Sequence, residues 1–399
     1  MPRNLLICVR RCINQKIIPR RIEITSRKLT ERRICKRMYT KKMLVLVALM
    51  IAAAVVFTAC AGPAGPAGPA GPAGPAGAQG EPGPALSATD LTCTECHNDT
   101  TLIWSKEAQF RKTSVHGTGE SFVRGEGTDC AGCHGTEGAK ARINAGLPPH
   151  DPSVVGVTNV SPFDCRTCHN IHTTYTKADF SLTGGEQPVT MEYTGGTFDG
   201  GAGNLCANCH QVRNPKPEVK DGNIAITSSR FGPHYGIPAP MLLGEGGLGD
   251  VTGSPSAHYK TVENTCVACH MGEEFNHTYT PDVARCQACH ADAENFDMNG
   301  VQTEITATLE ELHTLFVEKK LTNPDEVANP DHLWGIYDPA TDKWSNPSAD
   351  APLTVPEAVA NAMWNYKFVV YDKSMGVHNA AYTKAILQAA LDAVNAYTP

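Results

Sequence analysis

Aromatic residues make up only 7% of the 399-residue sequence, and charged residues only 19%. The sequence also contains 36 Gly and 28 Pro, which interrupt regular helices and strands. This composition argues against an ordinary helical bundle or a doubly wound sheet. Because large apolar side chains are scarce, we expect a bound group to fill much of the interior. The 16 cysteines indicate which group it is.

Cysteines that could form disulfides in the exported part of the chain are also lacking. Four cysteines, Cys8, Cys12, Cys35 and Cys60, lie at or before the end of an N-terminal export segment. The other twelve occur in six copies of the motif Cys-x-x-Cys-His. These motifs are Cys93/Cys96/His97, Cys130/Cys133/His134, Cys165/Cys168/His169, Cys206/Cys209/His210, Cys266/Cys269/His270 and Cys286/Cys289/His290.

The Cys-x-x-Cys-His motif fits covalent attachment of haem. Two thiolates three residues apart on a short helical turn can bond to both vinyl groups of haem b, and the histidine that follows can coordinate the iron. Zinc also binds Cys-x-x-Cys pairs, but a zinc site would not require histidine directly after the second cysteine six times. We therefore expect six covalently bound c-type haems, attached through the twelve cysteines. The six motif histidines are then the proximal iron ligands.

The charge of the chain is distributed unevenly. Residues 1–59 hold 14 of the 34 basic residues and 2 of the 41 acidic ones. The remainder has 20 basic and 39 acidic residues, which gives it a formal charge of −19. Because the phosphates of nucleic acid would repel such a surface, no nucleic-acid partner is expected.

Residues 1–59 are interpreted as an N-terminal extension plus a lipoprotein signal peptide. A 17-residue apolar run from Met43 to Ala59 follows two lysines and ends in small residues, as a secretory signal does. The run is short for a stable transmembrane span. Phe57-Thr58-Ala59-Cys60 resembles a bacterial lipobox, which predicts lipidation of Cys60 and a membrane anchor. Ordinary cleavage or a retained anchor helix are the alternatives.

Residues 60–88 are expected to form a tether behind the lipidated cysteine. Eight Gly-x-y triplets, mostly Gly-Pro-Ala, run from Gly62 to Ala85. This is the collagen period, so a trimeric stalk is one interpretation. A single-chain polyproline-II spacer, about 75 Å long at about 3.1 Å per residue, is favoured because eight triplets are marginal for a triple helix. A third view makes this segment an adhesion or trimerisation element and the haems secondary.

The remainder divides into a hexahaem cytochrome c domain, 89–300, and a C-terminal helical region, 301–399. Gly, Pro, Thr and Asn clusters between the motifs predict loops. Apolar spacing predicts C-terminal helices at about 302–320, 356–371 and 379–396, with a long surface connection over 321–352. The expected fold is mainly α with extensive loops, a multihaem cytochrome c fold organised around covalent haems. The C-terminal helices would cap this domain and offer a face for a homo-oligomer.

The sixth iron ligand separates an electron carrier from an enzyme, because an iron with two protein ligands has no position for substrate. Nine histidines lie outside the motifs, and six would complete bis-His ligation. Those in small-residue loops or at helix starts are the distal candidates: His116, His172, His234, His258, His277 and His378. His313 is either a ligand or a packed side chain, and His150 and His332 are expected at the surface or beside the sites. Met241, Met271 and Met298 are more simply packing residues.

Three sequence segments resemble segments of secreted multihaem cytochromes c of anaerobic and metal- or nitrogen-respiring bacteria. They are Cys168-His169-Asn170-Ile171-His172-Thr173-Thr174-Tyr175, Gly232-Pro233-His234-Tyr235-Gly236 and Gly376-Val377-His378-Asn379. The resemblance covers roughly residues 90 to 396. It implies an architecture related to pentahaem nitrite reductase and to the octahaem hydroxylamine and tetrathionate enzymes.

The same resemblance shows where the chain departs from the enzymes. Pentahaem nitrite reductase has lysine in place of the motif histidine at its catalytic haem, whereas all six motifs here end in histidine. Hydroxylamine oxidoreductases use a tyrosine cross-linked to one haem. Candidate tyrosines near a haem are Tyr175, Tyr193, Tyr235, Tyr259 and Tyr279, although packing is the simpler role for each.

The expected function is therefore electron transfer, with no catalytic residue assigned. An exported, lipid-anchored hexahaem cytochrome would pass electrons along closely packed bis-His haems in anaerobic or extracellular respiration. Its partners would be redox proteins or an extracellular electron acceptor, and its location the periplasm or the outer cell surface. The alternative is a multihaem reductase of a small nitrogen or sulfur oxyanion at one open haem.

Overall fold

A computed structural model describes residues 97, 102–113, 116–272, 274–324 and 332–399. The chain separates into one unit that ends at Gly83 and a second unit from Pro84 to Pro399, and every described residue lies in the second. The signal segment, Cys60, the Gly-Pro-Ala triplets and the cysteines Cys93 and Cys96 lie outside the described residues. The described residues form short helices and loops followed by three longer C-terminal helices.

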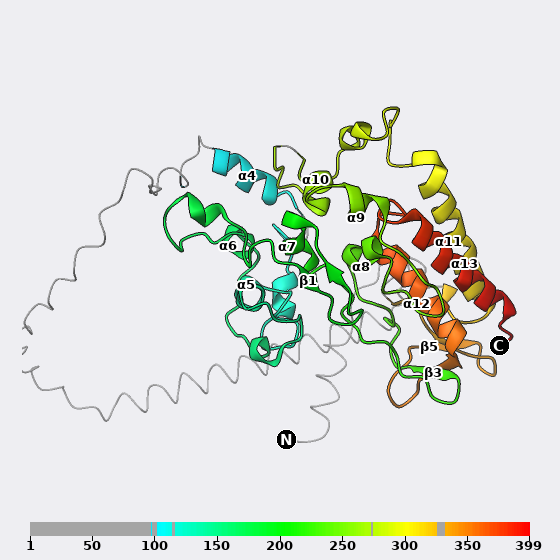
Figure 1. Ribbon diagram of the computed structural model, residues 1–399. Coiled ribbons are helices and arrows are strands. Elements are labelled where there is room, and N and C mark those ends of the chain that lie inside the picture. Colours follow the sequence, from blue (N-terminus) through cyan, green and yellow to red (C-terminus); the bar gives the residue numbers. More distant parts are fainter. Residues whose placement is uncertain (1–96, 98–101, 114–115, 273, 325–331) are drawn as a thin grey trace, which may run out of the picture. The chain divides into compact units, whose positions relative to one another are not determined.

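The part that carries the motifs consists of short helices joined by loops (Figure 1). Its α-helices are α4 (Leu102–Phe110), α5 (Thr136–Asn144), α6 (Cys165–Cys168), α7 (Asn204–Ala207), α8 (Pro238–Leu243), α9 (Ala257–Thr261) and α10 (Thr265–His270). Its 3-10 turns are η1 (Ser121–Arg124), η2 (Pro152–Val154), η3 (Lys177–Phe180), η4 (Gly201–Gly203), η5 (Val283–Ala288) and η6 (Met298–Gly300). Local polar groups begin and end these helices. The Asp164 carboxylate accepts the backbone N–H of Arg166 at the start of α6, and Gly244, with φ of 76°, ends α8.

The described strands form three small antiparallel sheets of two strands each. They pair β1 (Val189–Thr190) with β2 (Thr197–Phe198), β3 (Asn223–Ile226) with β6 (Leu353–Pro356), and β4 (Ile336–Asp338) with β5 (Lys343–Ser345). In the second sheet Ile224 lies opposite Val355. This sheet joins the motif-bearing part of the chain to the segment that leads into the C-terminal helices.

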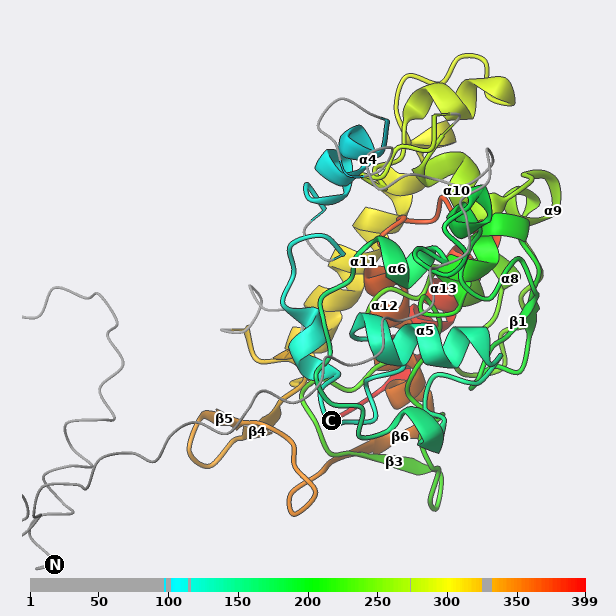
Figure 2. The same cartoon turned by 90° about the vertical axis from the view of Figure 1, so that its left-hand side faces the viewer.

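Three longer helices occupy the C-terminal part. They are α11 (Val301–Glu318), α12 (Glu357–Asp372) and α13 (Ala380–Ala396). The three windows expected from the apolar spacing are thus confirmed to within two residues. Helix α13 packs against both α11 and α12, and Figures 1 and 2 show the three side by side.

The main apolar core is built by these helices together with residues from Val212 onward. Helix α11 contributes Ile305, Leu309, Leu312 and Phe316, which recur at three- and four-residue steps on one face. Strand β3 and helix α8 add residues from the motif-bearing part to the same core. The C-terminal helices and that part of the chain therefore share one interior.

The connection before α12 differs from its expected form. The Asn-, Pro- and Asp-rich composition of 321–352 predicted a surface loop, but Leu321, Leu333 and Trp334 are buried. The indole N–H of Trp334 donates to the carbonyl of Phe231 at 2.7 Å. The composition of this stretch predicted a loop at the surface, but burying its large apolar side chains stabilises the fold, and these side chains lie in the core.

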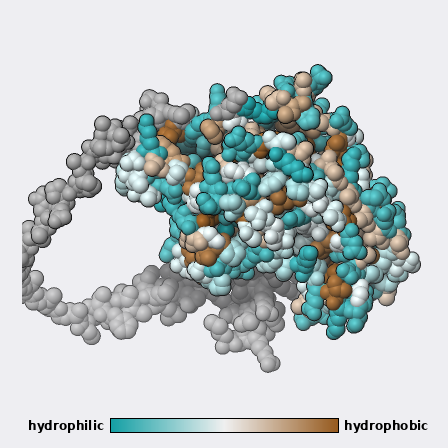
Figure 3. All heavy atoms as spheres, in the orientation of Figure 1, coloured by the Kyte–Doolittle hydropathy of each residue, from teal (hydrophilic) through white to brown (hydrophobic). Residues whose placement is uncertain are grey.

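The face of the molecule in Figure 3 is largely hydrophilic, with apolar side chains scattered over it. Among the helices that the structure describes, none has the length and apolar character needed to cross a membrane.

Candidate haem sites

Each described motif folds as a tight helical turn. The backbone N–H of the motif histidine donates to the carbonyl of the first motif cysteine in four of them. The N···O distances are 2.9 Å at His134, His169 and His210 and 2.7 Å at His290. In the fifth described motif, helix α10 includes both cysteines and His270. The ten described cysteines are all free thiols. Both thiols of a motif are therefore available to one cofactor.

The last motif lies in an exposed stretch of the chain. Cys289, its second cysteine, is exposed, and so are Cys165 and Cys269. Cys289 follows the end of η5 rather than lying within a helix, although its backbone N–H still donates to the carbonyl of Cys286 at 3.1 Å. Residues 287–292 are exposed throughout, because this stretch contributes nothing to either described apolar cluster and its polar side chains favour water. Cys289 is therefore an exposed thiol, and its bond to haem stays a prediction.

Each motif histidine lies opposite one histidine from another part of the chain. The two ring centroids are 5.9 to 6.4 Å apart in all six pairs. The pairs, called sites I to VI in motif order, are His97–His172, His134–His234, His169–His277, His210–His116, His270–His378 and His290–His258. All six second members are the histidines that the sequence singled out as distal candidates.

This spacing fits an iron between two imidazoles. A metal bound by two opposed imidazoles at about 2 Å per bond holds the ring centres about 6 Å apart. A shorter separation would leave no room for the ion, and a much longer one would prevent simultaneous ligation. Within the described residues, the groups that could bind metal are these pairs, since no cluster of three or more His, Cys, Asp or Glu is placed to hold an ion. The residues present fit haem.

The three remaining histidines have other neighbours. His150 contacts Glu192 through Nδ1 at 2.7 Å, and His332 contacts the Ser229 hydroxyl and the Arg230 guanidinium. His313 lies on α11 with its ring 6.5 Å from that of Tyr366. Within the described part of the chain, none of the three lies in ring contact with a motif histidine.

Half of the twelve paired imidazoles have a described acceptor at Nδ1. Nδ1 contacts a backbone carbonyl in five of them, and a carbonyl oxygen can only accept. The contacts are His169 to Phe180 (2.8 Å), His210 to Gly236 (3.1 Å), His258 to Val377 (2.8 Å), His270 to Tyr279 (2.9 Å) and His277 to Phe275 (2.7 Å). Because Nδ1 carries the proton, Nε2 keeps the lone pair that a metal requires.

At site V the acceptor is a carboxylate. Nδ1 of His378 lies 2.7 Å from Oδ1 of Asp372, whose side chain is 1% exposed. Burial by itself lowers the pKa of His378, but the charge and the hydrogen bond of Asp372 outweigh it, so that the pKa is raised. Asp372 also accepts from the hydroxyl of Ser374, which fixes the carboxylate beside the ring.

Site II has the opposite arrangement. Nδ1 of His234 receives the guanidinium of Arg213 at 2.6 Å and the backbone N–H of Tyr235 at 2.7 Å. Burial and the charge of Arg213 lower the pKa of His234 to about 3. Burial likewise lowers the pKa of His210 at site IV to about 4. Both rings are therefore held neutral.

One buried arginine connects two of the motif loops. Arg142, on α5, is 1% exposed. Its Nε donates to the carbonyl of Gly132 at 2.7 Å, inside the site II motif. Its Nη2 donates to the carbonyl of Asn208 at 3.0 Å, inside the site IV motif. Because a buried guanidinium requires such acceptors, Arg142 fixes the two cysteine loops relative to each other.

The five candidate tyrosines occupy different positions. Tyr279 lies edge-on to His116 at 5.3 Å, Tyr175 stacks on His172 at 5.7 Å, Tyr235 lies edge-on to His234 at 5.1 Å, Tyr193 lies 5.7 Å from His150 and Tyr259 lies 5.1 Å from Phe198. Three of them therefore contact paired imidazoles. The hydroxyl of Tyr259 accepts the backbone N–H of Asp199 at 2.8 Å, which is a packing role.

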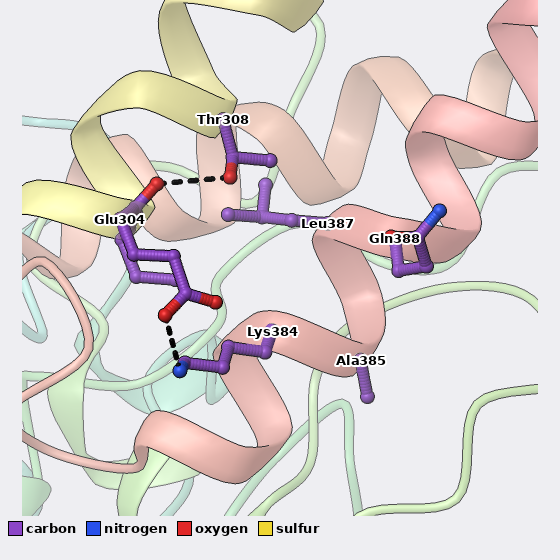
Figure 4. A pocket seen from close by; sticks show the side chains of 7 residues that line it. Glu304, Thr308, Lys384, Ala385, Leu387 and Gln388 are labelled. Carbon is purple, nitrogen blue, oxygen red and sulfur yellow. Dashed lines mark hydrogen bonds and ion pairs between the residues drawn. The ribbon is translucent and has the colours of Figure 1, made fainter. Parts of the chain in front are cut away.

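A small hollow lies between α11 and α13, away from any motif or paired histidine (Figure 4). Glu304 and Lys384 face each other across it, joined by an ion pair of 2.6 Å whose side chains are 55% and 41% exposed. Its lining offers neither a cysteine nor a histidine.

Arg142, Arg213 and Asp372 were not found by sequence reasoning. Each acts through contacts with residues distant in the chain or beyond the end of its own helix. Only Asp372 could have been found from the sequence, because it lies six residues before the candidate ligand His378. Nothing in the sequence distinguished the two arginines from solvent-exposed basic residues.

Part of the chain matches a known family model. Residues 85–181 match the family model of cytochrome c3. Two solved structures are similar. The outer cell wall cytochrome OcwA has a TM-score of 0.42 and 20% identity over 72% of this chain and 49% of its own. The undecahaem cytochrome from the S-layer of Carboxydothermus ferrireducens has a TM-score of 0.39 and 15% identity over 73% and 40%.

This chain thus corresponds to half or less of the length of those two structures. No curated protein sequence matches it significantly. The family match covers the first three haem motifs, and the same motif recurs three more times in the sequence. The chain is a multihaem c-type cytochrome.

Proposed function

We propose that this protein is a hexahaem electron relay in which all six haems are attached through the motif cysteines and lie between paired histidines. The six imidazole pairs with centroid separations of 5.9 to 6.4 Å carry this proposal. Haem supplies the one-electron chemistry when bound. The cysteines would hold it in place, and the paired histidines would supply axial ligands that leave at least five of the six haems without a position for substrate.

The hydrogen bonds at Nδ1 support this role. In five of the paired rings a carbonyl acceptor at Nδ1 favours the tautomer that ligates through Nε2 and fixes the ring's orientation. Fixed rings limit the rearrangement that accompanies gain or loss of an electron. This is the behaviour required of a carrier rather than of a site that must open to substrate.

Short stretches of backbone link neighbouring sites. His169 of site III and His172 of site I are three residues apart. Gly236, two residues after His234 of site II, accepts the Nδ1 hydrogen bond of His210 of site IV. One stretch of chain therefore supports axial histidines of two sites, which would hold the two haems close together.

Site V is linked to its neighbours in the same way. Tyr279, two residues after His277 of site III, accepts from His270 at 2.9 Å. His258 of site VI donates to the carbonyl of Val377, which directly precedes the second site V histidine. These links connect site III to site V and site V to site VI.

Contacts between motif cysteines indicate which sites lie next to site IV. Cys209 interacts with Cys133 of site II, and Cys206 interacts with Cys266 of site V. Tyr279 also touches His116 of site IV. Among the described contacts, sites III, IV and V form a centre, and sites I, II and VI each join it through one neighbour. The proposed relay is therefore branched, with three ends.

Site VI is an end of this relay with exposed residues, as is site I. Cys289 and His290 are both exposed, whereas the cysteines of the central site IV are partly covered. Electron transfer between proteins requires a haem that a partner can approach closely. Site VI is therefore one proposed exchange point for the redox partner, and site I, whose His97 and His172 are both exposed, is the other.

Export, a lipid anchor at Cys60 and a Gly-Pro-Ala tether complete the proposal. They rest on the signal-like segment and the triplets of the sequence, together with the attachment of c-type haem outside the cytoplasm. The tether would hold the haem domain away from the membrane. A redox protein or an extracellular acceptor would then exchange electrons at an end of the relay, in anaerobic or extracellular respiration.

The direct test is expression of the full chain with haem-attachment machinery, followed by mass spectrometry and low-temperature electron paramagnetic resonance. The relay predicts six covalent haems, with bis-His low-spin signals at five sites or more. Fewer than six attached haems, or several high-spin irons, would contradict it. A crystal or cryo-microscopy structure of the holoprotein would test the order of the sites.

A further inference from the structure

Site II differs from the other sites in how its second histidine is held. Seven paired histidines have a described side-chain hydrogen bond at Nδ1. Six of them contact a carbonyl or carboxylate oxygen, whereas His234 contacts only donors, the Arg213 guanidinium and the Tyr235 backbone N–H. We propose that site II, on the Cys130–His134 motif, has an open sixth position and binds small anionic ligands beside Arg213. This inference rests on the proposed haem attachment.

The first step of the argument is the hydrogen-bond chemistry of His234. A guanidinium has five N–H donors and no acceptor, and it stays protonated in proteins. A backbone N–H also only donates. The Nδ1 atom that meets both must therefore offer its lone pair, which leaves the ring proton of neutral His234 on Nε2. Nε2 then has no lone pair for iron, so His234 is a poor axial ligand in this arrangement.

The second step concerns the anchoring of that arrangement. Arg213 is held from both sides, because its backbone N–H donates to the carbonyl of Pro233 at 3.2 Å and its Nη2 donates to the carbonyl of Tyr235 at 2.7 Å. These contacts keep the guanidinium against the segment that carries His234. The loop itself therefore places hydrogen-bond donors at Nδ1 of His234, and the arrangement does not depend on one mobile side chain.

The third step is the chemistry offered to a ligand. Nε of Arg213 is buried and has no hydrogen-bond partner among the described residues. A buried N–H on a cation requires an acceptor, and an anion satisfies both its charge and its hydrogen bond. The acceptor could be a small anion from solution or the propionate of a bound haem, which share this chemistry. We assign it to the solution anion.

The proposed event is ligand binding without electron transfer. With its proton on Nε2, His234 makes no bond to iron that would have to break. A bound haem at site II would therefore offer an open position to a small anion such as cyanide. The positive charge of Arg213 stabilises the bound anion. Nothing is oxidised or reduced, so no co-reactant is needed.

Titration of the oxidised holoprotein with potassium cyanide tests the proposal. Visible absorption and electron paramagnetic resonance should show one of the six haems binding cyanide, while the other five keep their bis-His signals. If all six haems remain unchanged at cyanide concentrations that saturate open ferric haems, the proposal is wrong. Haem count by mass spectrometry is unaffected by that outcome, so the relay is judged separately.

Two variants assign the cyanide-binding haem. His234→Ala should leave that haem open and bind cyanide at least as tightly, still with one binding haem in total. A second cyanide-binding haem in His234→Ala would place the wild-type site elsewhere and overturn the assignment. His378→Ala serves as the positive control, because it should add a second binding haem.

Arg213→Leu tests the arginine. Loss of the cation should weaken cyanide binding about tenfold or more, as expected for a lost charge-assisted hydrogen bond. Arg230→Leu is the matched control, because Arg230 also contacts a histidine, His332, that belongs to no pair. Unchanged cyanide affinity in Arg213→Leu would assign Arg213 to a haem propionate and overturn its proposed role.

Discussion

The motif-bearing part and the C-terminal part of this protein form their interiors in different ways. The main apolar core has 28 buried residues, most of them from Ile305 onward, whereas the second cluster, which lies in the motif-bearing part, has seven. The C-terminal helices have 16 to 18 residues, while helices that carry motif cysteines have four to six. One region is packed by side chains, and the other is arranged around facing histidines and thiols.

This difference shows what a covalent cofactor replaces. A helix of four residues is not stable by itself, since helix nucleation is costly and few residues propagate it. The short motif helices are instead supported by caps, buried carbonyl contacts and the proposed haems. The long C-terminal helices bury a continuous apolar face and need no such support. The two regions should therefore respond differently to loss of haem and to loss of a core side chain.

The largest expected effect is that of omitting haem. In protein made without haem-attachment machinery, residues 102–210 should exchange amide hydrogens rapidly and be cleaved readily. Helices α11 to α13 should keep much of their protection, because their core consists of side chains. Hydrogen exchange followed by mass spectrometry measures this directly. Equal protection of the two regions would show that haem does not organise the motif-bearing part.

A core truncation should affect the other region. Trp364, on α12, is 2% exposed, and its indole N–H donates to the carbonyl of Gly246 at 2.9 Å. Trp364→Ala should reduce the free energy of unfolding by about 3–5 kcal/mol through the lost apolar contacts and the cavity that remains. Denaturant titration of the holoprotein measures this value, with haem count unchanged.

Trp104→Ala is the matched control for that truncation. Trp104, on α4, is 51% exposed, so its loss should change stability by no more than about 0.5 kcal/mol. If the two variants were equally destabilised, the contrast between a packed and a cofactor-supported region would fail.

A smaller effect is expected where the two regions meet, at the end of α12. The Asp372 carboxylate makes His378 a stronger electron donor and favours the more positive ferric state. Asp372→Asn should raise the reduction potential of the site V haem by on the order of 60 mV, equivalent to about 1.4 kcal/mol for a one-electron couple. Spectroelectrochemical titration measures the shift, and exposed Asp392→Asn is the control. A fall in potential would contradict the role of Asp372.

The smallest effect is expected on the surface of the C-terminal helices. Lys384 and Glu304 form an exposed ion pair between α13 and α11 (Figure 4). Lys384→Ala should cost about 0–1 kcal/mol of stability, and less at high salt, because water and ions screen the pair. Denaturant titrations at low and high salt provide the test. A loss comparable to that of Trp364→Ala would mean that the pair supports the packing of the two helices.

Sequence periodicity predicted the C-terminal helices well because their apolar residues recur on one face. It failed at Trp334, which lies in a polar stretch yet is buried against Phe316 at 5.1 Å between ring centroids. Local composition does not reveal a partner that lies elsewhere in the chain. The same limit applies to Cys289, because the motif predicts its chemistry but not its exposure. The domain boundaries at 59, 88 and 300 remain predictions, and the shared core shows only that residues on both sides of 300 pack together.

The sequence by itself determined the six attachment motifs, the motif histidines and the set of histidines able to face them, because spacing along the chain dictates how two thiols and an imidazole meet one cofactor. Only the tertiary structure decided which histidine faces which motif. His172 follows the site III motif by three residues yet lies opposite His97 of site I. Arg213 and Asp372 likewise give two distal histidines opposite surroundings. Such pairings depend on loops that bring distant segments together, and no local pattern encodes them.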